Sequence, residues 1–178
     1  MSALAMGLLK KGCSVSGSDL IKNNETNKLE GLGAVIFTSQ VRQNIEFVIS
    51  KFTNKLINFV VSSAIKPENE EFSYCREKKL SIKHRSEILA MIMQNYTALA
   101  IAGSHGKTST STFLSTLLEL CTHNSSSITG GIIPIYNSNC HLEDTKFLVA
   151  EADESDGSII KYKSDIGIIN NIDFDHCD

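Results

Sequence analysis

The segment that most constrains the fold is Leu99 to Thr110, LAIAGSHGKTST. An apolar run that predicts a buried strand leads into Gly103 and Gly106, then into Lys107 and a stretch with helical periodicity. Phosphate groups need this arrangement, because glycine lets backbone N–H groups turn around an anion and a helix N-terminus adds a favourable dipole. A helix start with a chance lysine is the alternative, and the strand–loop–helix order disfavours it. We therefore predict a phosphate-binding loop.

Three side chains of this loop have expected tasks. Lys107 can reach the β and γ phosphates of a nucleotide, and the Thr108 hydroxyl can bind magnesium. A packing role is hard to assign to His105 inside such a loop, so contact with a substrate is favoured. The expected nucleotide-binding set is Gly103, Ser104, His105, Gly106, Lys107, Thr108 and Ser109.

Strands alternate with helices along the chain, which predicts an α/β fold with a parallel sheet. Strands are expected over residues 13–16, 34–37, 57–61, 80–83, 99–102, 147–150 and 166–169, and helices over 2–11, 26–32, 67–78, 86–94 and 108–121. The strand over 57–61 is expected to be buried on both faces. Residues 124–127, NSSS, are interpreted as a loop. A boundary near residues 84–86 divides the chain into domains of residues 1–85 and 86–178.

Composition excludes several classes of partner. The chain has 178 residues and a net charge of −3, so it carries no basic field for nucleic acid. Its apolar runs are far too short to cross a bilayer, so no membrane insertion is expected. Five scattered cysteines without a CxxC pair argue against a disulfide framework or a zinc knuckle. They favour a reducing cytoplasm.

Carboxylates gather after the strand that ends near Ala150. Residues 151–156, EADESD, hold four of them. Such a run is usually a solvated loop, but directly after an apolar strand it favours a cation site, with Glu151 at the strand end. His176 offers a neutral imidazole, which is an acceptable but secondary magnesium ligand, and a lone histidine is more often structural.

Polar residues also follow strands of the first domain. Asp19 stands at a strand end where an acid often meets a ribose or a base. Ser62 and Ser63 follow the strand over 57–61 and can donate to a pyrophosphate. Turn formation explains all three residues equally well, and both interpretations stay open here.

The spacing within the loop departs from the common phosphate-loop pattern, which has four residues between its glycines. Only Ser104 and His105 separate Gly103 from Gly106. This short form resembles the loop of the Mur ligase family. Further segments resemble signatures of that family, in order along the whole chain: VSGSD at 15–19, VSSAIK at 61–66, HRSEIL at 84–89, EADESD at 151–156 and NNIDFDH at 170–176.

The resemblance implies a Rossmann-like domain for UDP-N-acetylmuramate in residues 1–85 and the first part of a central ATP-binding domain in residues 86–178. It implies ATP and Mg²⁺ as cofactors, with Thr108, Glu151 and His176 at the metal. Lys107, His105, Glu151 and His176 are then the expected catalytic residues, and Asp19, Ser62, Ser63 and Arg85 the substrate-binding ones. For Arg85, a link between domains is an equally open role.

The implied reaction is ATP-dependent ligation of L-alanine to UDP-N-acetylmuramate through an acyl phosphate, a cytoplasmic step of peptidoglycan precursor synthesis. A sibling ligase that adds another amino acid or a peptide is the alternative enzyme. A non-catalytic nucleotide-binding polypeptide is the alternative outside enzymes. Compared with the family, we expect the first strand, the rest of the ATP domain and the C-terminal domain to be missing, so the chain alone should be inactive. Ser109 and Thr129 also depart from the family pattern.

Overall fold

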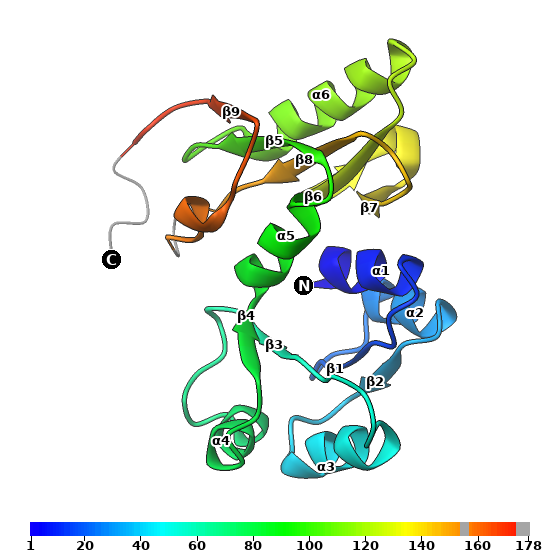
Figure 1. Ribbon diagram of the computed structural model, residues 1–178, viewed down its shortest axis with the longest axis vertical. Helices are drawn as coiled ribbons and strands as arrows, with labels where there is room; N and C mark the ends of the chain where they lie inside the picture. The colour runs from blue at the N-terminus through cyan, green and yellow to red at the C-terminus, as the bar shows by residue number, and fades with distance from the viewer. Residues whose placement is uncertain (154–156, 174–178) are drawn as a thin grey trace. The chain divides into compact units, whose positions relative to one another are not determined.

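A computed structural model describes residues 1–153 and 157–173 of the chain. It divides into two compact units, Met1–Arg85 and Ser86–Asp178. Helices alternate with strands in both units, and most strand pairs are parallel (Figure 1). The predicted α/β fold class is therefore confirmed.

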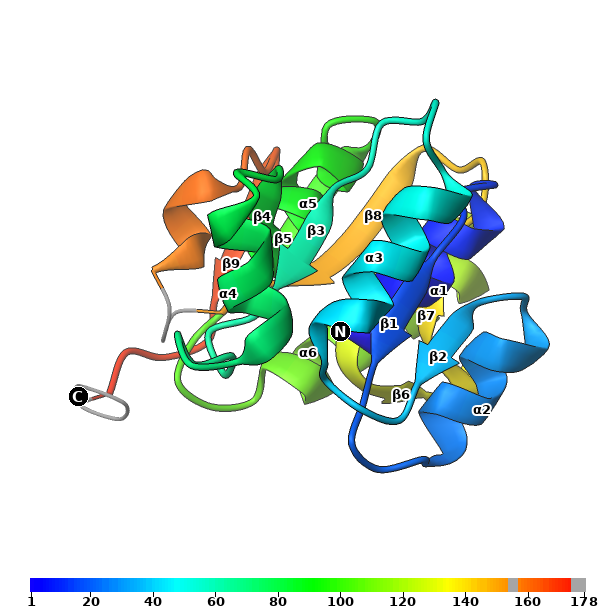
Figure 2. The ribbon, with the colours of Figure 1, turned by 90° about the horizontal axis from the view of Figure 1, so that it is seen from below.

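The first unit contains two pairs of parallel strands. Its elements are α1 (Ser2–Lys10), β1 (Ser16–Ser18), α2 (Asn24–Gly31), β2 (Val35–Phe37), α3 (Arg42–Lys51), β3 (Phe59–Val61), α4 (Glu70–Glu77) and β4 (Ile82–His84). Figure 2 shows β1 beside β2 and β3 beside β4. In the described part of the chain no strand joins the two pairs, so the expected Rossmann-like sheet occurs as two separate two-stranded sheets.

Several predicted boundaries in this unit are wrong. The strand expected over 13–16 lies at Ser16–Ser18, and α3 was not predicted. The helix expected from Pro67 begins at Glu70, because the Asn69 side chain accepts the Phe72 N–H and caps the helix there. The strand expected to be buried on both faces is only half-buried, because β3 has a single strand neighbour.

The second unit is built on one five-stranded sheet. Its elements are α5 (Arg85–Met93), β5 (Thr97–Ala102), α6 (Lys107–Leu120), β6 (Ser125–Ile133), η1 (Pro134–Tyr136), β7 (Ser138–His141), β8 (Phe147–Glu151), η2 (Ser158–Lys161) and β9 (Ile166–Ile169). The strand order is β7-β6-β8-β5-β9, and all neighbours are parallel except β6 and β7. Figure 1 shows α6 lying along one face of this sheet.

The path of the chain through this sheet determines which loops lie at the carboxyl ends of its strands. From β5 the chain moves through α6 to β6, then to β8, and finally crosses to β9 on the other side of β5. The strand order therefore reverses around β5. Ligands of open α/β sheets bind at the carboxyl ends of the strands, next to such a reversal.

The start of β6 corrects the sequence interpretation most clearly. Residues 125–127 were interpreted as loop, but these three serines are fully buried in the strand. Each hydroxyl has a partner inside the unit: the Ser127 Oγ lies 2.9 Å from the Ser115 Oγ, and the Ser126 Oγ lies 2.9 Å from the Thr145 Oγ1. A polar strand can be buried here because its hydroxyls are paired within the fold.

We predict that Ser127→Ala destabilises the second unit by about 1–3 kcal/mol, because it leaves the buried Ser115 hydroxyl without its partner. The double variant Ser115→Ala/Ser127→Ala should cost less than the sum of the two single variants. Urea unfolding of all three measures this. Ser164→Ala, at an exposed position, is the matched control. Additive costs would show that the pair is not coupled.

Other expectations from the sequence concern single residues. The helix expected over 86–94 is α5, which begins one residue earlier at Arg85, and Ser86 is fully buried inside it. Cys13, Cys75, Cys121 and Cys140 are free thiols in the described part of the chain. Burial raises the pKa of the Cys75 thiol to about 11, with a smaller contribution from the charge of Glu71, so this thiol is unreactive. Within residues 1–153 and 157–173, no helix is long and apolar enough to cross a membrane.

Candidate nucleotide site

The connection from β5 to α6 has a backbone that only glycine adopts easily. Gly103 has a φ of 134° and Gly106 a φ of 81°. A Cβ atom on Gly103 would lie 3.1 Å from both the N and the O of Asn171. A Cβ on Gly106 would lie 3.2 Å from Asn170 Nδ2. Both glycines are therefore required at this loop, for the backbone conformation and for space.

The loop ends at the N-terminus of α6. Gly106 is the N-cap residue and no side chain caps the helix. The first N–H groups of a helix have no partner within the helix, and the helix dipole makes this end positive. The Lys107 side chain adds a full positive charge. Its Nζ donates to the Gly103 carbonyl at 2.6 Å, which holds this charge beside the loop. Backbone, dipole and lysine together make the loop suited to an anion such as a phosphate group.

An acid and two hydroxyls meet beside the loop. Glu151 ends β8, which pairs with β5, and its two carboxylate oxygens accept from different residues of α6. Thr108 Oγ1 donates to Glu151 Oε2 at 3.4 Å, and Ser111 Oγ donates to Glu151 Oε1 at 2.8 Å. A Cβ on Gly130 would lie 3.0 Å from Glu151 Oε2 and 3.8 Å from Thr108 Oγ1, so this glycine keeps space open beside both oxygens.

These oxygens fit a magnesium ion better than a transition metal. Mg²⁺ prefers oxygen ligands and is usually held by one or two carboxylates together with phosphate groups and water. Thr108 and Glu151 offer such a set next to the phosphate loop. No group of three or more His, Cys, Asp or Glu side chains converges within the part of the chain that the structure describes. The third expected ligand, His176, lies outside the described residues, as do residues 154–156 of the acidic run.

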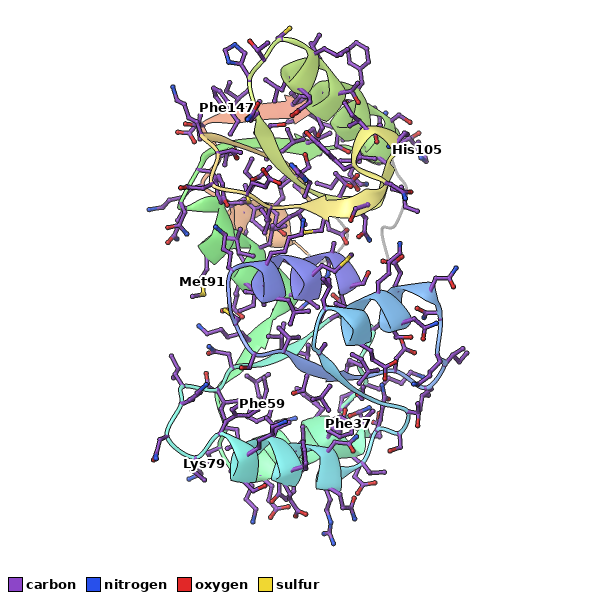
Figure 3. The ribbon with its side chains drawn as sticks, turned by 90° about the vertical axis from the view of Figure 1, so that its right-hand side faces the viewer. Phe37, Phe59, Lys79, Met91, His105 and Phe147 are labelled. Carbon is purple, nitrogen blue, oxygen red and sulfur yellow. The ribbon has the colours of Figure 1, made fainter. Side chains whose placement is uncertain are left out.

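The remaining residues of the expected nucleotide set lie around the loop. His105 is exposed and follows the end of β5; Figure 3 shows it and Phe147, which starts β8, at opposite ends of the sheet. Ser104 is half-buried, and its Oγ donates to the Asp173 carbonyl at 3.3 Å. Ser109 is exposed in the first turn of α6.

Sequence reasoning missed the residues that hold the loop from outside. Asn170 and Asn171 follow β9, and both side chains bond to the backbone of His105. Ser111 was also missed as the second partner of Glu151. The NNIDFDH motif pointed to this segment, but nothing in the linear sequence shows that its asparagines meet the loop 65 positions earlier.

The expected substrate residues of the first unit lie at strand ends. Asp19 follows β1, and its Oδ1 accepts the Ile21 N–H at 3.1 Å, which is the bond that a turn aspartate makes. Ser62 and Ser63 follow β3, and the Ser63 Oγ lies 3.2 Å from the His84 Nε2 at the end of β4. Ser63 and His84 are thus brought together, whereas Asp19 belongs to the other strand pair.

Arg85 follows β4 directly and is half-buried. Its charge lies close enough to the N-terminal amine of Met1 to lower the pKa of that amine, after the larger effect of burial. His84 ends the parallel strand β4 beside Ser63, and this position identifies it as a further candidate for substrate contact.

Two family models match the chain. Residues 1–97 match the Mur ligase family, catalytic domain, and residues 101–178 match the Mur ligase middle domain. The phosphate loop lies in the second match. The first match extends past the first compact unit, through α5 to the first residue of β5.

Curated relatives are similar over the full chain. A UDP-N-acetylmuramate–L-alanine ligase of Prochlorococcus marinus subsp. pastoris is 74% identical, and one of Synechococcus sp. is 44% identical. All of this chain is covered in both, but only 38% and 37% of those proteins, respectively. The chain thus spans well under half the length of these relatives.

Solved structures share the fold. A UDP-N-acetylmuramate:L-alanyl-gamma-D-glutamyl-meso-diaminopimelate ligase of Neisseria meningitides matches with a TM-score of 0.89 at 23% identity, over 100% of this chain and 59% of that one. A UDP-N-acetylmuramate-alanine ligase of Thermotoga maritima matches with a TM-score of 0.84 at 23% identity, over 99% of this chain and 40% of that one.

Proposed function

This chain belongs to the Mur ligase family, and from that premise we propose that it is part of an ATP-dependent ligase that joins L-alanine to UDP-N-acetylmuramate in the cytoplasm. The observation that carries the proposal is the phosphate loop with Thr108 and Glu151 facing each other beside it. The relative at 74% identity, which carries this name, supports the choice of substrates.

The reaction has two steps. A carboxylate oxygen of UDP-N-acetylmuramate attacks the γ-phosphorus of ATP, and the bond from phosphorus to the ADP oxygen breaks. The amino group of L-alanine then attacks the carbonyl carbon of the acyl phosphate. Inorganic phosphate leaves with the former carboxylate oxygen, and the amine loses a proton.

The chain's own residues stabilise charge in the first step. Negative charge spreads over the oxygens of the transferring phosphoryl group, so preorganised positive groups lower the barrier. We assign that task to the Lys107 ammonium group and to the N–H groups at the start of α6. Thr108 and Glu151 would hold Mg²⁺, which when bound supplies further positive charge to the phosphates. His105, exposed at the loop, is assigned to substrate contact.

We assign the first unit to the sugar nucleotide. Asp19, Ser62, Ser63 and Arg85 are the proposed contacts, and they lie at the carboxyl ends of parallel strands, where such ligands bind. These residues decide which sugar nucleotide is accepted, so an acceptor panel tests the proposal directly.

We predict that a chimaera, in which this chain replaces the matching 38% of the Prochlorococcus marinus subsp. pastoris relative, releases phosphate from ATP only when UDP-N-acetylmuramate and L-alanine are both present. The 178-residue chain alone should release none, because ligation needs three aligned reactants and alignment supplies about 7–11 kcal/mol of the barrier reduction. The measurement is coupled detection of phosphate.

Two results would contradict this proposal. A chimaera that prefers UDP-N-acetylmuramoyl-L-alanine as acceptor would assign the first unit to a sibling ligase of a later step. A chimaera that folds and binds ATP but transfers to no sugar nucleotide would favour a nucleotide-binding polypeptide without catalysis.

A further inference from the structure

The shape of the phosphate loop depends on a segment far away in the sequence. Three residues after β9, which we call the loop clamp, bond to the loop: Asn170, Asn171 and Asp173. The backbone of the first residue is itself fixed to the strand that leads into the loop, because the Asn170 N–H donates to the Ala102 carbonyl at 3.0 Å.

The Asn171 side chain bonds to both backbone groups of a single residue, His105. Its Oδ1 accepts the His105 N–H at 2.9 Å, and its Nδ2 donates to the His105 carbonyl at 3.1 Å. A side-chain amide in this position acts as a strand would, because it satisfies the N–H and the C=O of one residue together. The orientation of both peptide planes at His105 is thereby fixed.

Asn170 makes a second hydrogen bond to the His105 carbonyl. Its Nδ2 donates to the His105 carbonyl at 3.2 Å, and its Oδ1 accepts from Thr110 Oγ1 in α6 at 3.1 Å. The Asp173 backbone closes the clamp at Ser104, where its N–H donates to the Ser104 Oγ at 3.1 Å. The clamp therefore joins the loop to the first turn of the helix that follows it.

The glycines of the loop fit this arrangement. A Cβ on Gly103 would lie 3.1 Å from Asn170 Cβ, and a Cβ on Gly106 would lie 3.2 Å from Asn170 Nδ2. The clamp thus packs against the loop at both glycines. A Cβ at either position would be closer to Asn170 than almost all real Cβ contacts, so Asn170 would have to shift by a few tenths of an ångström.

The clamp also determines which backbone N–H groups of the loop can face a phosphate. The His105 N–H points to Asn171 and is engaged there, so it is not one of the groups that face a phosphate. The N–H groups at the start of α6 remain for that task.

We propose that Asn170 and Asn171 are positioning residues for the nucleotide, which set the loop geometry that the N–H groups of α6 and Lys107 need for binding phosphates. The proposal rests on the nucleotide-binding function assigned above. Asn171→Ala removes two hydrogen bonds to His105, and Asn170→Ala removes one. The loop then samples other conformations, so the fraction of binding-competent molecules falls and the affinity for nucleotide falls in proportion.

The test uses the chimaera and two measurements. Amide hydrogen exchange of residues 103–107 reports the clamp itself, and titration with Mg·ATP reports binding. We expect Asn171→Ala to raise loop exchange and to weaken ATP affinity roughly ten-fold or more, because two hydrogen bonds to the loop are lost. Asn170→Ala should have the same direction, and Thr110→Val a smaller effect.

Matched controls separate positioning from general stability. Asn95→Ala removes an exposed side-chain amide that donates to backbone carbonyls at the end of α5, away from the loop, and should change neither measurement. Ser127→Ala destabilises the same unit through its core and should lower the unfolding midpoint without weakening ATP binding. His105→Ala should keep the loop protected, because Asn170 and Asn171 bond to the backbone N–H and C=O of His105, which alanine retains.

The outcomes are distinct. Faster loop exchange with unchanged ATP affinity in both asparagine variants would overturn the positioning role. Unchanged exchange would overturn the clamp. If the unsubstituted chimaera does not bind ATP, or if its Lys107→Ala variant binds ATP equally well, the assigned nucleotide function fails, while the exchange measurement still decides the clamp.

Discussion

Lys107→Ala is expected to lower the rate of ligation by on the order of 10²-fold or more in the chimaera, with the fold unchanged. The Lys107 Nζ lies within the loop, 2.6 Å from the Gly103 carbonyl, at the positive end of α6. In the proposed reaction its charge faces the transferring phosphoryl group, and loss of one preorganised charge contact raises the barrier directly.

The measurement is the turnover number at saturating substrates, together with ATP affinity. Lys146→Ala is the matched control, because Lys146 is an exposed lysine of the same unit that lies over the Phe147 ring at the opposite end of the sheet. Lys107→Arg keeps the charge but not its position, so it should restore binding more than turnover. Near-normal turnover in Lys107→Ala would refute the assignment of the phosphate loop.

Glu151→Gln is expected to raise the magnesium concentration needed for half-maximal rate by roughly ten-fold or more, by analogy with the loss seen when groups supporting a metal site are removed. The substitution keeps the size of the side chain and one oxygen acceptor, but removes the negative charge that faces Thr108. A neutral amide is a weaker ligand for a hard divalent cation.

The dependence of rate on magnesium measures this effect at constant ATP. His176→Ala, whose role rests on the family resemblance, should act in the same direction. Glu143→Gln is the matched control, since this exposed glutamate precedes β8 instead of ending it. Because Glu151 also accepts from Ser111, Ser111→Ala shows whether an effect comes from the metal or from a moved side chain. An unchanged magnesium dependence of the rate in both Glu151→Gln and His176→Ala would refute the assignment of these residues as magnesium ligands.

Local features could be predicted from the sequence because their causes lie within a few residues. The strand, the glycines, the lysine and the helix of the phosphate loop all occur within residues 99–110, and β5 and α6 begin within two residues of the predicted positions. The strand at Ile166–Ile169 was predicted with its full bounds, because a short apolar run between polar loops has few other solutions.

Burial of polar residues could not be predicted, because their partners are distant. Ser125 to Ser127 look like a loop by polarity alone. Their hydroxyls are satisfied by α6, by residues near the start of β8 and by η1, and only the folded chain brings these together. The antiparallel β7 was missed for a related reason, because His141 and its neighbours do not alternate in polarity.

Local sequence specifies a glycine-containing loop between a strand and a helix, with acids and asparagines after later strands. What those residues contact depends on the tertiary structure. Glu151 reaches Thr108 because β8 pairs with β5, and Asn171 reaches His105 because β9 pairs with β5 on the other side. Strand order depends on packing and hydrogen bonds between segments 40 to 66 residues apart, and no local pattern of side chains encodes it.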